Sequence, residues 1–162
     1  DEVEAVIGAL EITPFRDKPT HALSGGQKKL VSIADILVMH PEIIILDEPS
    51  AALDPKHTQM VNRIVAQMTE AGITVIMATH DVDYAYAWAD EVILFHEGKV
   101  LLHGAPDVVF SDHDALHKTN LHPPTVLSLF ERLCNKGVLS PDLPCPRDLD
   151  TLENYLTDAM HR

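Results

Sequence analysis

Apolar residues recur at helical spacing in several segments of the chain, and most of these segments carry helix start or stop signals. In the first 110 residues this pattern predicts helices over residues 2–10, from Gly25 to before Pro41, between Asp54 and Gly72, and after Asp81. Ser24 and Gln27 have the spacing of a capping box, which places a helix start at Gly25. We expect the second and third helices to bury Leu30, Ile33, Ala34, Leu37, Val61, Ile64, Val65 and Met68.

Continuous apolar runs at residues 43–46 and 74–78 separate these helices. Such runs are typical of strands buried on both faces of a parallel sheet. A strand pair is also predicted at residues 92–95 and 100–103, with a turn at residues 96–99 between them. Strands that alternate with helices in this way indicate an α/β fold with a parallel sheet.

The character of the chain changes after Ser111, where prolines become frequent and six of the ten histidines lie at or after His96. Two helical patterns remain in this tail, at residues 126–133 and 149–156. We therefore expect three parts, with boundaries at residues 1–40, 41–110 and 111–162, the last part being a separate helical appendage.

The balance of charge limits the partners of the chain. Its 12 Lys and Arg against 25 Asp and Glu give a formal charge of −13, which argues against a nucleic-acid partner or a grip on anionic lipid. Cys134 and Cys145 lack metal-type spacing, so we expect no disulfide scaffold and a reducing compartment. No apolar run reaches the length of a membrane span.

The run IIILDEP, at residues 43–49, places two acids at the carboxyl end of a predicted strand. Ligands of open α/β sheets bind at that edge. Asp47 is suited to hold Mg²⁺ through its water shell, and Glu48 can accept a proton from an attacking water. The alternative interpretation is a buried strand that ends in solvated acids before a proline turn.

The segment LSGGQ, at residues 23–27, places Gly25 and Gly26 at a helix N-terminus. Free N–H groups and the helix dipole suit an anion there, and the missing Cβ atoms let the backbone approach a phosphate. The Ser24 hydroxyl can donate to a phosphate oxygen or cap its own helix, and both interpretations stay open. Many ordinary junctions between a turn and a helix also look like this segment.

Two further segments follow in order. SAALD, at residues 50–54, contains Asp54 and is also typical of a loop–helix junction. His80 comes just after the run 74–78, where a neutral imidazole could bond a phosphate or a water, although a histidine at a strand end is more often structural. The four segments together occur in one order with the spacing of strands and helices that each requires, and this combination favours a single functional interpretation.

With these motifs, residues 23–110 resemble the C-terminal half of an ABC ATPase, a P-loop NTPase with a parallel sheet flanked by helices. The resemblance implies that the signature residues Ser24, Gly25, Gly26 and Gln27 contact ATP held by an opposite subunit, and that Asp54 lies in the D-loop beside that ATP. It also implies Mg²⁺ handling by Asp47, general-base catalysis by Glu48 and a phosphate-sensing switch at His80. Leu30 departs from the family pattern, which commonly has Arg at this position.

The stretch ATHDVDYAYAWADEVILFHEGKVLLHGAPDVVF, at residues 78–110, is similar to the ATPase subunits of energy-coupling-factor importers, especially the cobalt/nickel type. This resemblance implies an ATP-hydrolysing subunit for import of cobalt or nickel ions or a vitamin. It implies two partners, a second ATPase subunit in a homo- or heterodimer and a transmembrane coupling subunit, with a peripheral location on the cytoplasmic face of the cell membrane. Residues 1–40 would be a remnant of the helical subdomain, residues 41–110 half of the ATPase core, and residues 111–162 an extension.

No G-x-x-x-x-G-K-[ST] phosphate loop occurs in the 162 residues, so we expect a piece of a longer enzyme that does not hydrolyse ATP alone. Two alternatives stay open. One is a non-transport ABC protein that acts on ribosomes or DNA. The other is a metal-responsive regulatory piece, in which His113 and His117 chelate a divalent ion; a solvated polar turn with scattered histidines explains the same residues.

Overall fold

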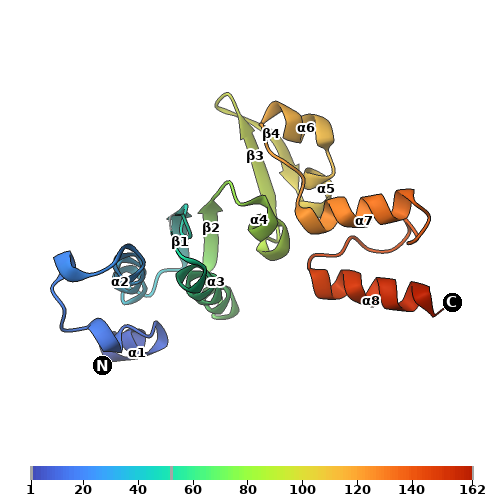
Figure 1. Ribbon diagram of the computed structural model, residues 1–162. Helices are drawn as coiled ribbons and strands as arrows, with labels where there is room; N and C mark the ends of the chain where they lie inside the picture. Colours follow the sequence, from blue (N-terminus) through green and yellow to red (C-terminus); the bar gives the residue numbers. More distant parts are fainter. Residues whose placement is uncertain (1, 52, 162) are drawn as a thin grey trace. The chain divides into compact units, whose positions relative to one another are not determined.

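The computed structural model describes residues 2–51 and 53–161. Contacts within the chain divide it between Thr79 and His80 into two compact units, which we describe separately. This grouping differs from the predicted boundaries at residues 40 and 110, because the first unit contains helices and strands of both earlier parts. Figure 1 shows the order of the elements along the chain.

The first unit consists of helices and two strands. In chain order these are α1 (Glu2–Ala9), the short 3-10 helices Thr13–Phe15 and Thr20–Ala22, α2 (Gly25–Leu37), β1 (Ile43–Asp47), α3 (Pro55–Glu70) and β2 (Thr74–Ala78). The helix starts expected at Gly25 and after Asp54 are confirmed, since the side chains of Ser24 and Asp54 cap α2 and α3. The expected buried residues are confirmed except Leu37, which is only half-buried.

Strands β1 and β2 pair in parallel, with Ile43 opposite Thr74 and Asp47 opposite Ala78. The prediction that both strands are buried on both faces is wrong for the described residues. Ile44 and Leu46 are buried, but Ile43, Ile45 and Ile76 are 59%, 71% and 52% exposed. Successive side chains of a strand point to opposite faces, and α3 packs against β2, so the described residues cover one face and leave the other open.

The second unit begins with α4 (Val82–Trp88) and a hairpin of β3 (Val92–His96) and β4 (Lys99–Gly104). Four helices follow: α5 (Pro106–Phe110), α6 (His113–Lys118), α7 (Thr125–Asn135) and α8 (Leu149–Met160). The predicted strand pair and the two predicted tail helices are confirmed, whereas α5 and α6 were not expected. The predicted strand–helix alternation does not extend the parallel sheet here, because β3 pairs antiparallel with β4 in a sheet of its own.

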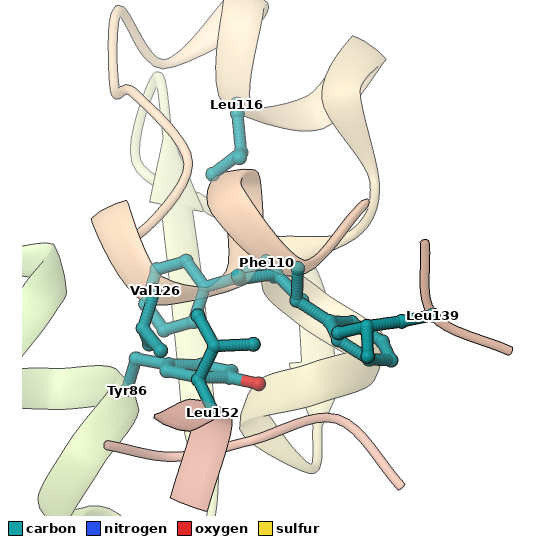
Figure 2. Close-up of a cluster of buried hydrophobic side chains, with 8 residues drawn as sticks. Tyr86, Phe110, Leu116, Val126, Leu139 and Leu152 are labelled. Atoms are coloured by element: carbon teal, nitrogen blue, oxygen red, sulfur yellow. The ribbon is translucent and has the colours of Figure 1, made fainter. Parts of the chain in front are cut away.

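The second unit is organised around one cluster of buried side chains, shown in Figure 2. Its members come from α4 through α8 and the intervening loops: Tyr86, Phe110, Leu116, Val126, Leu127, Phe130, Leu139 and Leu152. Tyr86 and Leu127 have no exposed surface, and the rings of Tyr86 and Phe110 meet edge to face with centroids 6.0 Å apart. Residues after 110 therefore share a core with α4 and α5 and do not pack as a separate appendage.

None of the helices among the described residues has both the length and the apolar character required to span a bilayer.

Candidate functional site

The β1–α3–β2 segment brings two of the sequence motifs to one edge of the parallel sheet. Asp47 is the last residue of β1 and lies opposite Ala78, the last residue of β2. Both strands therefore deliver the residues that follow them, Glu48 and Thr79, to the same carboxyl edge. This is the edge at which open α/β sheets bind their ligands.

Glu48 is held by three hydrogen bonds at this edge. Its backbone N–H donates to the carbonyl of Ala78 over 2.9 Å, and one carboxylate oxygen, Oε2, accepts from the Thr79 hydroxyl over 3.3 Å. Its carbonyl accepts from Nζ of Lys29 on α2 over 2.5 Å. Glu48 also has a φ of 44°, a conformation that costs a non-glycine residue about 1–3 kcal/mol and persists only where surrounding contacts enforce it. The half-buried carboxylate is thus fixed from both strands and from α2.

Sequence reasoning did not single out Lys29 or Thr79. Thr79 lies within the ATHD segment, so its position directly after a predicted strand was an available signal. Lys29 carried no such signal, because a lysine beside a buried helical stripe is an ordinary surface residue. Leu30, the departure from the family pattern, is 1% exposed and contributes to the core under α2.

The turn at Ser24 has the geometry of a complete capping box. The Ser24 Oγ accepts from the Gln27 N–H over 3.2 Å, and the Gln27 Oε1 accepts from the Ser24 N–H over 3.0 Å. A serine hydroxyl has one donor hydrogen and two acceptor lone pairs, and the cap uses an acceptor. Capping and donation to a phosphate oxygen are therefore compatible, which removes the competition expected from the sequence.

The two glycines of this turn have different surroundings. A Cβ atom placed on the exposed Gly25 would have no neighbour within 4 Å. A Cβ atom on the buried Gly26 would lie 2.7 Å from two ring carbons of His57, on the first turn of α3. The missing side chain at Gly26 is thus required by packing within the chain, whereas Gly25 leaves open space in front of the helix N-terminus.

Asp54 is exposed and serves as the N-cap of α3. Its carboxylate accepts from the backbone N–H of His57 over 3.0 Å and lies 2.6 Å from Nδ1 of the same residue. The backbone hydrogen bond first, and then the bond from the His57 ring, lower the pKa of Asp54 below its usual value. Of the expected D-loop, Ala52 lies outside the described residues.

His80 is exposed and is the first residue of the second unit. Asp81 follows it and caps α4 by accepting from the Tyr84 N–H over 3.0 Å. The tail holds α4 at both ends: the Thr125 N–H donates to Asp83 over 2.5 Å, and Arg147 donates to the carbonyls of Tyr86 and Ala89. The element that carries His80 is therefore anchored by residues 40 to 60 positions further along the chain, which the sequence patterns did not reveal.

The histidines of the tail lie on α6. His113 and His117 are exposed, and Nε2 of His113 lies 3.4 Å from a carboxylate oxygen of Glu131. Across residues 2–51 and 53–161, no group of three or more His, Cys, Asp or Glu side chains is placed to hold a metal ion.

Comparison with known proteins gives matches for this arrangement. The family model described as "ABC transporter" matches residues 1–51. The energy-coupling factor transporter ATP-binding protein EcfA of Methanocaldococcus jannaschii is 44% identical over 134 residues, which cover 83% of this chain and 48% of that protein. The cobalt import ATP-binding protein CbiO of Rhodobacter capsulatus is 42% identical over 150 residues, which cover 93% of this chain and 54% of that protein.

A solved structure shares the fold as well as the sequence. The structure of cbiO1 from Clostridium perfringens, described as part of the ABC transporter complex cbiONQ, is 43% identical and has a TM-score of 0.62. The match covers 80% of this chain and 52% of that one. The chain thus spans about half the length of the relatives it matches.

Fold, motif order and these similarities agree on one class, the ATP-binding domain of an ABC transporter, and the chain belongs to this family. Within the family, its matches are named as energy-coupling-factor and cobalt-import ATP-binding proteins, at about 42% identity over most of the chain.

Proposed function

We propose that the chain is the C-terminal part of the ATP-hydrolysing subunit of an energy-coupling-factor importer, with cobalt or nickel ions or a vitamin as cargo. The observation that carries this proposal is the restrained position of Glu48, beside Asp47 at the carboxyl edge of the parallel sheet. The named relatives support the importer class, because they align with most of this chain.

Asp47 is the residue we propose for Mg²⁺. It is exposed at the strand end, and Mg²⁺ typically takes one or two carboxylates and completes its shell with water and substrate phosphates. A single accessible carboxylate fits that requirement, so the donor set on this chain is compatible with the ion. When bound, Mg²⁺ would neutralise charge on the phosphates of ATP.

Glu48 is the proposed general base. A base must reach the proton it removes within hydrogen-bond distance, and the hydrogen bond from Thr79 orients this carboxylate at the sheet edge. We propose His80, at the head of the second unit, as the residue that senses the phosphate. Both assignments rest on the family resemblance and on positions after the strand ends.

The exposed turn Ser24–Gln27 and Asp54 are proposed to contact ATP held by a second ATPase subunit. Gly25 leaves space for a phosphate to approach the first turn of α2, and the Ser24 hydroxyl retains its hydrogen for donation. A second ATPase subunit is therefore one proposed partner. A transmembrane coupling subunit is the other, with the protein located at the cytoplasmic face of the membrane.

The test is Glu48→Gln in the longer protein that contains this chain. The amide keeps the size and hydrogen bonding of the side chain but cannot accept a proton, so ATP turnover should fall by about 10²-fold or more while ATP binding persists. Phosphate release and nucleotide binding would be measured on the same preparation. A variant that keeps more than about a tenth of the wild-type rate would exclude Glu48 as the base. We expect the 162-residue chain by itself to show no turnover.

A further inference from the structure

His57 joins two segments that the proposed function assigns to the same nucleotide. It lies on the first turn of α3, three residues after Asp54, and its side chain is 27% exposed. Its ring packs on Gly26, at the first turn of α2, so closely that a Cβ atom there would meet Cγ and Cδ2 at 2.7 Å and the His57 Cβ at 3.2 Å. Contacts below 3.0 Å require one of the two groups to move.

The other edge of the ring is held by Asp54. Nδ1 of His57 lies 2.6 Å from Oδ2 of Asp54, while the other carboxylate oxygen accepts from the His57 backbone N–H over 3.0 Å. Because a carboxylate accepts, this bond requires the hydrogen on Nδ1. The imidazole is thus fixed between a carboxylate on one side and a glycine backbone on the other.

We propose that His57 is a positioning residue that sets the distance between loop 50–54 and the signature turn Ser24–Gln27. This proposal rests on the function proposed above, in which Asp54 and the signature turn contact one ATP molecule. His57 would act through Asp54 and Gly26 and would not itself touch the nucleotide. Losing it should misplace the two segments and slow turnover more than it weakens binding.

The first experiment tests the contact alone, by thermal unfolding. Gly26→Ala should lower Tm on the order of 5 °C when His57 is present, because the added methyl group displaces the ring. In a His57→Ala background the same substitution should leave Tm unchanged or raise it, since alanine favours a helix and the space is empty. Gly25→Ala is the matched control and should not lower Tm. Equal losses from Gly26→Ala in both backgrounds would overturn the proposal.

The second experiment tests the role in turnover, in the longer protein that contains this chain. We expect His57→Ala to lower kcat about ten-fold with KM changed less than about two-fold. His57→Gln keeps an N–H donor for Asp54, and His57→Phe keeps a ring against Gly26, so each should restore part of the rate. Lys56→Ala, on the exposed neighbouring residue, is the control and should match wild type.

The results separate the two proposals. A wild-type protein that binds ATP without hydrolysing it would overturn the proposed function, and the Gly26 comparison would still decide the contact. An active wild type in which His57→Ala leaves kcat unchanged would overturn the positioning role and leave the proposed function intact.

Discussion

The two units of the chain use apolar side chains in opposite ways. In the first unit, the open face of the β1–β2 sheet leaves Ile45 71% exposed, beside the proposed catalytic edge. In the second unit, Tyr86 and Leu127 are completely buried in a cluster to which α4 through α8 contribute. The comparison teaches that helix caps and a β–α–β connection suffice to arrange the site residues of the first unit, whereas long-range packing holds the second unit together.

The largest expected effect is the loss of Tyr86 from the cluster of the second unit. Tyr86→Ala should destabilise this unit by about 3–5 kcal/mol, as is typical when a buried aromatic side chain is removed. Tyr86→Phe is the matched control: the Tyr86 hydroxyl is buried without a hydrogen-bond partner, so its removal should be neutral or stabilising. Hydrogen exchange, followed separately in each unit, measures both changes. Loss of protection in α2 and α3 as well would contradict the distinction between the units.

A smaller loss is expected at Arg147, which ties the loop before α8 to α4. Its guanidinium donates to the carbonyls of Tyr86 and Ala89 over 3.1 and 2.8 Å and lies 5.6 Å from the Tyr86 ring centroid. Arg147→Met should cost about 1–3 kcal/mol in denaturant unfolding, because two carbonyls lose a charged donor. Arg132→Met, at an exposed position on α7, should cost less than about 0.5 kcal/mol.

The second unit should also lose stability at high pH. Desolvation raises the pKa of Tyr86 to about 12, and desolvation followed by the nearby Asp81 raises the pKa of Tyr84 to about 12. Between about pH 10 and 12 the unfolded chain loses these protons while the folded unit keeps them, so stability falls as pH rises and is unaffected by these groups below about pH 10. Ultraviolet absorbance of tyrosinate, read with circular dichroism, measures this. Tyr86→Phe should remove one late ionisation, and a normal titration of both tyrosines in the folded protein would contradict the prediction.

The smallest effect on stability is expected on the open sheet face of the first unit. Ile45→Lys and Ile76→Lys should change unfolding free energy by about 0.5 kcal/mol or less, because both side chains are already largely exposed. Their effect should be on association: we expect the 162-residue chain to form a defined oligomer through this apolar face, and the lysines to shift light scattering towards the monomer. Wild-type chain that stays monomeric over a wide concentration range would refute this expectation.

Local signals predicted much of the site. Ser24, Asp54 and Asp81 were each expected as helix caps, and each side chain accepts from the backbone N–H three residues later. Such a cap depends on a few neighbouring residues, so its sequence signal is complete. The exposure of β1 and β2 was predicted wrongly, because a continuous apolar run shows that both strand faces are apolar but not which face is covered by the described residues.

The sequence by itself determined the elements that carry the motifs, their order, and the family to which this chain belongs, because these follow from short-range spacing. Only the tertiary structure decided that Lys29 bonds the carbonyl of Glu48, that the His57 ring lies on Gly26, and that Arg147 holds the end of α4. These contacts join residues 19 and 58 positions apart in the first and last cases. They form only when separate helices pack, and no local pattern of apolar and polar residues specifies which polar side chain will reach which distant backbone atom.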